Sequence, residues 1–385
     1  MKNLIIFTTA LVISITTYAC AQQKNNPVND SLLLDYYQNQ KFAEASDYLK
    51  SIYPEPVTNL KALSRLAYTA QMANKLPEAE SYYQRLYALD STQTGVLFSL
   101  ASLNLKRGNL NKAFDYYTRI TRTDSTNFIV YKQLARISAE KNDIPGCMTN
   151  LQKANKLNPQ DADVAADLSD YYVSLKQLPV AEKVLGIAIT ADPENTVLLE
   201  SLVKLEYAQK NWPGTIKAGE KLLQLGDNNT SMLIKLGQAY YFDKNYICGI
   251  ETLAGIGPTL QNETSYYFTA VCYKQLKKQH LAIKYLNLAI EAAVSPAMNS
   301  YYSELADSFD NLKEIKKSIA AYKKSLEYQE TPLVYYSLAT IYDAELKDKK
   351  NAVKYYKKYL AAKPPINQQT YIAFTKSRLT QLNLD

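Results

Sequence analysis

The chain has 385 residues, 47% of them hydrophobic, which is enough apolar material for a continuous core. A single histidine, His280, excludes a histidine-based metal cluster within one chain, and a histidine-dependent catalytic triad would depend on that residue alone. No P-loop, CxxC or GxSxG motif is present. We therefore expect no enzymatic activity, no bound metal and no cofactor.

Residues 1–21 have the composition of a signal peptide. Lys2 gives a positive start, and residues 4–15 form an apolar run that is short for a membrane span and is followed by small residues. The pattern predicts an exported protein, located in the periplasm or anchored as a lipoprotein of a bacterial cell envelope.

Two processing routes fit the end of this signal. Ala19-Cys20-Ala21 obeys the small-x-small rule of the ordinary signal peptidase, which would leave Gln22 as the first residue. Alternatively, the signal covers residues 1–19 and Cys20 becomes a lipidated N-terminus. In either case residues 22–27 form a short linker.

From residue 28 onward, a small residue returns about every 34 positions. A leucine stands thirteen residues before most of them, and a larger filler residue stands four residues after most of them. So regular a period indicates a stacked array of repeats, which presents an extended surface to partners. The series of small residues is Ala45, Ala79, Ala113, Cys147, Ala181, Thr215, Gly249, Ala282, Ser318 and Ala352.

Each repeat is predicted to be two amphipathic helices, as residues 97–124 illustrate. Leu97, Leu100 and Ala101 share a face of a first helix, and the apolar pattern resumes at Leu110 after a break. The break contains Gly108, which suits the left-handed backbone that ends many helices. The small residue of each repeat is explained by close approach of two helix backbones.

These features resemble the tetratricopeptide repeat (TPR) family. One repeat matches its signature at Leu134-Ala135, Ala154 and Asn158-Pro159, and the next repeat matches at Tyr172, Ala181, Ala188 and Asp192-Pro193; the family's first-helix tryptophan is absent throughout. The resemblance implies an all-α, right-handed superhelical solenoid of about ten hairpins over residues 28–365. It also implies a protein or peptide partner bound on the concave face of the first helices.

Within this array, residues 212–262 are predicted to be irregular. Glycine and proline at Pro213-Gly214, Gly219, Gly249 and 255–258 remove bulk and helix propensity, so we expect a bend or a looser interface there. After the last repeat, residues 366–385 are predicted to form a capping helix, because Tyr371, Phe374, Leu379 and Leu382 recur on one face.

Projection of the first helices gives candidate ligand-binding residues on the concave face. They lie four residues apart on either side of the buried stripe, and their character changes from basic to acidic to aromatic along the chain. Aromatic side chains of this kind suit peptide anchoring, although the chain has 33 tyrosines and many of them are expected in the core. The candidates are Tyr68, Phe98, Lys132, Arg136, Asp170, Glu200, Tyr241, Phe242, Tyr267 and Tyr336.

The net charge of +7 arises in the C-terminal part of the chain. Residues 1–273 contain 26 basic and 26 acidic residues, whereas residues 274–385 contain 18 and 11. Two lysine clusters, at 313–324 and 347–358, fit either a solvated outer helix face or attraction to an anionic membrane, a glycan or an acidic partner. An exported protein is not expected to bind nucleic acid.

Three classes of function follow from the sequence. The preferred one is a non-catalytic envelope scaffold that binds a protein or peptide, with or without a lipid tether at Cys20. The second is a periplasmic receptor for a soluble ligand or glycan that uses a tyrosine-rich groove around Tyr241 and Tyr267. The third is a homo-oligomeric structural element, for which light scattering is the discriminating measurement.

Overall fold

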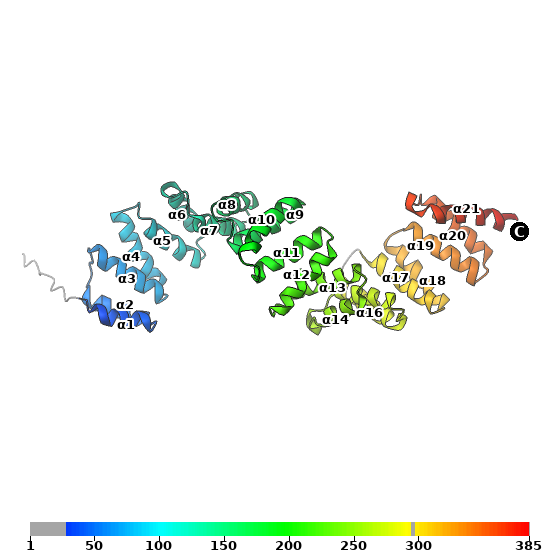
Figure 1. The fold of residues 1–385 in the computed structure, drawn as a ribbon, viewed down its shortest axis with the longest axis horizontal. Helices are drawn as coiled ribbons and strands as arrows, with labels where there is room; N and C mark the ends of the chain where they lie inside the picture. Colours follow the sequence, from blue (N-terminus) through cyan, green and yellow to red (C-terminus); the bar gives the residue numbers. More distant parts are fainter. Residues whose placement is uncertain (1–27, 294–296, 385) are drawn as a thin grey trace, which may run out of the picture. The chain divides into compact units, whose positions relative to one another are not determined.

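The computed structural model describes residues 28–293 and 297–384, and all regular secondary structure among them is helical (Figure 1). The predicted signal peptide, Cys20 and the linker at 22–27 lie outside the described residues. The all-α class and the succession of ten helical hairpins followed by a terminal helix are confirmed. The right-handed superhelix stays a prediction.

The chain divides into two compact units, Met1–Cys147 and Met148–Asp385, and the division falls within helix α8. The N-terminal unit contains α1 (Asp30–Gln38), α2 (Phe42–Ile52), α3 (Leu60–Met72), α4 (Leu76–Leu89), α5 (Thr94–Lys106), α6 (Leu110–Thr123), α7 (Phe128–Glu140) and the first turn of α8 (Ile144–Leu157).

The C-terminal unit continues with six further hairpins and the last helix. Its α-helices are α9 (Ala162–Ser174), α10 (Leu178–Ala191), α11 (Thr196–Ala208), α12 (Trp212–Gln224), α13 (Thr230–Phe242), α14 (Tyr246–Ala254), α15 (Glu263–Gln275), α16 (Gln279–Ala292), α17 (Met298–Asn311), α18 (Ile315–Tyr328), α19 (Pro332–Thr340), α20 (Lys349–Ala361) and α21 (Gln369–Leu384). Three short helical turns complete it: η1 (Pro258–Leu260), η2 (Ile341–Glu345) and η3 (Ile366–Gln368).

The first helix of most repeats begins at an Asn or Asp whose side chain caps it. Asn59, for example, accepts a hydrogen bond from the amide of Ala62 at 3.0 Å, and Asn229 accepts one from Met232 at 2.9 Å. Such a cap satisfies an amide that the helix itself leaves without a partner. Side-chain oxygens at Asn29, Asn127, Asp161, Asn195 and Asn262 do the same.

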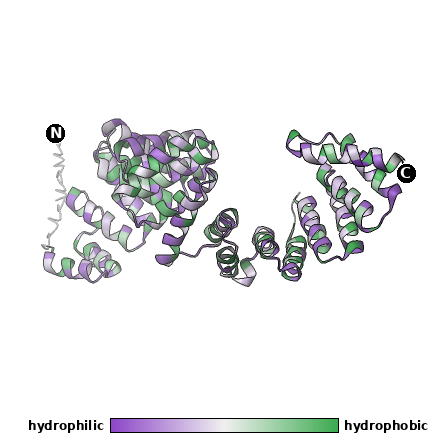
Figure 2. Cartoon of the chain, turned by 45° about the vertical axis from the view of Figure 1, so that its right-hand side comes forward, coloured by the Kyte–Doolittle hydropathy of each residue, from purple (hydrophilic) through white to green (hydrophobic). Residues whose placement is uncertain are grey.

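The recurring small residues lie where the helices of a repeat pack most closely. All ten of them are buried, with Ala45, Ala113 and Ala352 at 0% exposure. The fillers four residues later, such as Leu49 and Tyr117, are buried as well. Along each helix, hydrophobic and hydrophilic residues alternate in the way expected for one buried and one exposed face (Figure 2).

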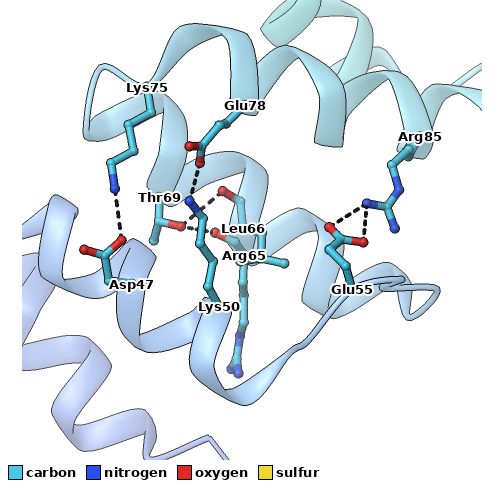
Figure 3. A network of polar contacts seen from close by, with 9 residues as sticks. All are labelled: Asp47, Lys50, Glu55, Arg65, Leu66, Thr69, Lys75, Glu78 and Arg85. Carbon is cyan, nitrogen blue, oxygen red and sulfur yellow. Dashed lines mark hydrogen bonds and ion pairs between the residues drawn. The ribbon is translucent and has the colours of Figure 1, made fainter.

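Exposed ion pairs join the second helices of the first two repeats (Figure 3). They connect α2 and the loop after it with α4 and the turn before it. Pairs with this exposure contribute little individually, about 0–1 kcal/mol each. The N–O distances are 2.5 Å for Lys50–Glu78, 3.0 Å for Lys75–Asp47 and 2.9 Å for Arg85–Glu55.

The irregular stretch predicted at 212–262 contains the short helix α14, which stops at Ala254 and is followed by the 3-10 turn η1. Gly237 is required there, because a Cβ at this position would stand 2.5 Å from the Leu253 side chain. The division of the chain into two compact units falls at 147/148 and not in this stretch. A looser interface at 212–262 stays a prediction.

The terminal helix α21 packs on α20. Thr375 and Leu382 face inward, and the Arg378 guanidinium binds both carboxylate oxygens of Asp343, at 2.7 and 2.9 Å. Among the described residues, no helix is both long and apolar enough to cross a bilayer.

Candidate functional site

Two positions of each first helix form the centre of what we call the first-helix face, which also includes the side chains adjacent to them. The two positions lie fifteen and eleven residues before the small residue of the repeat, so they are one helical turn apart on the same side. In the N-terminal unit this face is hollowed twice.

The first hollow lies between α1 and α3 and has a volume of about 400 Å³. Tyr68, a predicted site residue, lines it and is 44% exposed. Its ring meets those of Tyr37 and Phe42 edge to face, with centroids 5.7 and 6.5 Å away. The hollow is lined by Asp30, Leu33, Leu34, Tyr37, Lys61, Ser64, Arg65 and Tyr68.

The second hollow lies between α5 and α7, with a volume of about 430 Å³. Two predicted residues, Phe98 and Arg136, line it together with Ser102, Lys106 and Glu140. The ring of Phe98 lies edge to face on Tyr117 at 5.4 Å, and burial raises the pKa of Tyr117 to about 12, so this phenol stays neutral. Both hollows therefore use equivalent positions of successive first helices.

Each hollow has one more positive than negative group. In the first, Arg65 binds Asp30 at 2.7 Å and Lys61 is left over. In the second, Arg136 binds Glu140 of its own helix at 3.2 Å and Lys106 is left over. Lys132, the remaining predicted residue of this unit, is half-buried on α7 and does not line either hollow. The arrangement favours a ligand with apolar groups and a negative charge.

In the C-terminal unit, polar groups of the first-helix face pair with one another. The predicted residue Asp170 binds Lys204, which stands at the equivalent position of the next repeat. Further along, the Lys274 ammonium lies between Glu304 and Asp307, at 2.5 and 2.9 Å. The sequence alone suggests that these charges are available for a ligand. In the structure they already form ion pairs within the protein.

The predicted residue Glu200 belongs to a carboxylate pair. Burial raises the pKa of Glu200, and the neighbouring Asp227 carboxylate raises it further. The amide of Asn229 donates a hydrogen bond to Glu200 at 2.6 Å. On α13, the first helix of the following repeat, burial lowers the pKa of Lys235.

Tyr241, Phe242 and Tyr267 lie in one aromatic cluster of the C-terminal unit. Phe242 is 43% exposed and stacks on Trp212, with centroids 4.5 Å apart and planes 17° from parallel. Tyr241 meets Phe268 edge to face at 5.5 Å, and Phe268 in turn meets Tyr267 at 5.3 Å. Trp212, the first residue of α12, is not among the predicted ligand-binding residues.

Tyr336 is separate from that cluster. Its ring contacts Tyr371 and Phe374 of α21, at 4.8 and 6.2 Å, and Tyr359 of α20 at 5.4 Å. The terminal helix therefore packs against this side chain, which the sequence alone does not anticipate.

A further cavity of about 580 Å³ is lined by residues of α10, α11 and α12 and of the loop after α10. Gly214 and Ala218 of α12 and Leu202 of α11 line it. Leu202 is consequently only partly buried, unlike Leu66 and Leu100 at the same position of other repeats.

The described residues contain no group of three His, Cys, Asp or Glu side chains placed to hold a metal ion. Cys248 and Cys272 are free thiols, as is Cys147. Burial raises the pKa of the Cys272 thiol to about 12.

Comparison with known proteins identifies the repeat. The profile of the family described as "Tetratricopeptide repeat" matches residues 263–293, 300–332 and 333–365. These segments coincide with the last three hairpins, α15 to α20. A search of curated proteins found no match.

Solved structures of similar type include a tetratricopeptide repeat protein from Parabacteroides merdae ATCC 43184, with 12% identity, coverage of 65% of this chain and 98% of that one, and a TM-score of 0.44. The Cut9-Hcn1 hetero-tetramer of APC/C matches with 15% identity, 89% and 74% coverage and a TM-score of 0.46. MamA protein matches with 26% identity, 43% and 90% coverage and a TM-score of 0.39.

The three profile matches identify residues 263–365 as tetratricopeptide repeats, and the other described hairpins of the chain share their helix-turn-helix form and their period of about 34 residues. Repeats of this kind generally act as scaffolds for protein interactions.

Proposed function

We propose that this protein is a non-catalytic scaffold of the cell envelope that binds an extended peptide segment of a partner along the first-helix face of its N-terminal unit. The observation that carries the proposal is the pair of hollows between α1 and α3 and between α5 and α7. They repeat the same helix positions, and each offers an aromatic side chain beside a net positive charge. A peptide that alternates apolar and acidic residues would suit both.

Site-specific photo-cross-linking in native envelopes tests this proposal. A photoreactive residue replaces Tyr68 in one variant of the full exported chain and Arg136 in another. A matched control carries it at Tyr328, which is similarly exposed, at 49%, on the second helix α18. We expect the same partner at both test positions and not at the control.

A second change adds specificity to this experiment. Phe98→Ala, introduced into the variant that cross-links through position 68, should weaken the cross-link, because one continuous peptide would lose an aromatic contact in the other hollow. Identical products at positions 68, 136 and 328, or none at the two test positions, would overturn the proposal.

A second candidate function is a glycan receptor that uses the aromatic cluster of the C-terminal unit. The exposed face of Phe242 beside Trp212 offers a flat surface of the kind that can stack on sugar rings. Trp212 is the only tryptophan of the chain, so its fluorescence reports on this place alone. A saturable change on titration with envelope oligosaccharides, lost in Phe242→Ala, would favour the receptor over the peptide scaffold.

The envelope location is proposed from the signal-like N-terminus and is tested by the intact mass of the recovered protein. A diacyl or triacyl mass on Cys20 would identify a tethered scaffold. An N-terminus at Gln22 would identify a protein released from its signal without a lipid.

A further inference from the structure

The turn between the two helices of each repeat contains one residue with left-handed backbone, five positions before the small residue. In the C-terminal unit this residue is lysine in all six repeats, and all six lysines are exposed. Their φ angles lie between 52° and 65°. They are Lys176, Lys210, Lys244, Lys277, Lys313 and Lys347.

The last three of these turns carry additional lysines. Lys278, Lys316, Lys349 and Lys350 are all exposed next to the left-handed residues. Lys313 binds Glu345 at 2.9 Å, but both partners are well exposed to water, which weakens the pair. In the described part of the chain, Lys277, Lys347 and the four additional lysines have no carboxylate oxygen within 4.0 Å. We call the seven lysines of the last three turns the basic edge: Lys277, Lys278, Lys313, Lys316, Lys347, Lys349 and Lys350.

The basic edge is a row along one end of consecutive hairpins. Every one of these turns joins the end of a first helix to the start of a second helix, and the hairpins pack in sequence through α16 on α17 and α18 on α19. Neighbouring packed helices lie about 8–10 Å apart, so we expect the charges of consecutive turns to be spaced by a distance of this order.

Three other lysines of this region have a different environment. Lys323, Lys354 and Lys358 hold their ammonium groups over the rings of Tyr342, Tyr355 and Tyr335, at 5.9, 5.6 and 5.2 Å. These contacts occupy the lysines of the second helices with neighbouring side chains. Of the nine lysines in the described part of this region that have neither a carboxylate nor a ring as a short-range partner, six therefore lie on the basic edge, and the others are Lys357, Lys363 and Lys376.

Large aliphatic side chains are exposed beside these lysines. Leu346, immediately before Lys347, is 46% exposed, and Leu281, three residues after Lys278, is 38% exposed. The preceding turn adds Ile247, which is 59% exposed and lies three residues after Lys244. The edge thus combines flexible point charges with apolar groups that are able to enter an interface.

We propose that the basic edge docks this protein onto the surface of an anionic lipid bilayer. The edge contains lysine and no arginine, so it lacks the rigid two-pronged geometry that favours one defined phosphate or carboxylate. A row of lysines attracts an anionic membrane by about 1 kcal/mol for each side chain near the surface. The exposed Leu281 and Leu346 distinguish a bilayer from a soluble polyanion, because only the bilayer offers an apolar layer beneath its charges.

Vesicle co-sedimentation tests the proposal with the exported, processed chain carrying Cys20→Ser, which cannot be lipidated. The vesicles contain phosphatidylcholine with 30 mol% phosphatidylglycerol, or phosphatidylcholine alone. We expect binding to the anionic vesicles only, and a decrease on raising the salt concentration from 0.1 to 0.5 M, since exposed charges are then screened.

Two variants that remove four lysines each make the test specific to one face. Lys278→Gln, Lys316→Gln, Lys347→Gln and Lys350→Gln together should weaken binding at least about tenfold. The control combines Lys323→Gln, Lys324→Gln, Lys354→Gln and Lys358→Gln, which lowers the net charge equally and should change binding less than about threefold. Circular dichroism checks that both variants fold.

Three results would overturn the proposal. One is absence of binding to anionic vesicles, and a second is equal loss in the two variants, which would indicate net charge without a preferred face. The third is binding to dextran sulfate under conditions where vesicles do not bind, which would assign the edge to a soluble polyanion. Leu281→Ser combined with Leu346→Ser should reduce vesicle binding while leaving binding to dextran sulfate unchanged.

Discussion

The two compact units build the same turn from different residues. In the N-terminal unit the left-handed position holds Gln40, Asn74, Gly108 and Asn142, and in the C-terminal unit it holds only lysine. Asparagine and glycine enter this conformation most readily, whereas most other residues pay about 1–2 kcal/mol. A positive side chain at the end of a first helix recovers about 0.3–1 kcal/mol from the helix dipole. Backbone preference alone therefore does not account for six lysines.

The first-helix face differs between the units as well. In the N-terminal unit it opens into two hollows, whereas in the C-terminal unit Asp170 binds Lys204, and Lys274 binds Glu304 and Asp307. Equivalent positions in a repeat protein are thus not equally available to a ligand. Which face binds depends on how neighbouring repeats pair their side chains.

The largest expected effect concerns one core position in both units. Leu100→Ala in the N-terminal unit should cost about 2–5 kcal/mol, because Leu100 is fully buried and a cavity would remain. Leu202→Ala, at the equivalent position of the C-terminal unit, should cost about half as much, because Leu202 already borders a 580 Å³ cavity. Urea denaturation of both variants measures the difference, and equal losses would contradict the described packing of repeat six.

Ion pairing on the first-helix face gives the next effect. Lys274→Met should destabilise the protein by about 1–2 kcal/mol, because Glu304 and Asp307 would lose a cation whose side chain is only 17% exposed. Arg65→Met should cost less than about 1 kcal/mol, since its partner Asp30 is 72% exposed. In 0.5 M salt, the same denaturation experiment should show an even smaller effect of Arg65→Met. A larger destabilisation by Arg65→Met than by Lys274→Met would mean that burial does not determine the strength of these two ion pairs.

The repeat itself was predictable from the sequence. A 34-residue period with a small residue such as Ala113 at the helix crossing places ten hairpins and a terminal helix without further information, because helix periodicity and steric exclusion are local properties. Three of the predicted ligand residues, Tyr68, Phe98 and Arg136, do line hollows of the first-helix face.

The remaining site features depend on contacts between repeats, which local periodicity does not encode. The pairing of Asp170 with Lys204 requires the stagger of α9 against α11, and Tyr336 lies against α21 only because the terminal helix packs there. The left-handed lysines were missed for another reason. Lysine is a common exposed residue, so its recurrence at one turn position is meaningful only once the backbone angle is known.

The turn comparison predicts opposite effects of two substitutions. Lys244→Gly should stabilise the protein by about 0.5–1 kcal/mol, because glycine removes the strain of a φ of 65° and only part of the gain is lost to the freer unfolded chain. Asn74→Lys, which imports the C-terminal type of turn into the N-terminal unit, should destabilise by about 0.5 kcal/mol. If Lys244→Gly were destabilising, lysine at this position would contribute to the stability of the fold, and the turn lysines would need no explanation beyond stability.

The smallest effect depends on pH and probes the carboxylate pair of the C-terminal unit. Burial, and then the nearby Asp227, raise the pKa of Glu200 above its ordinary value of 4.5, so the folded state favours the protonated form. Stability from this group is fully present below pH 4.5 and is lost as the pH rises through the folded-state pKa.

Glu200→Gln should therefore stabilise the protein at pH 7 and have no such effect at pH 4. We expect a gain of only a few tenths of a kcal/mol, since water screens a half-buried pair. Glutamine keeps an acceptor for the amide of Asn229, which makes the substitution a test of charge alone. Thermal melts at the two pH values measure the difference, and an equal change at both would assign the effect to packing. In the N-terminal unit, Glu140→Gln is the matched control, because its partner Arg136 is exposed and no second carboxylate shares that hollow.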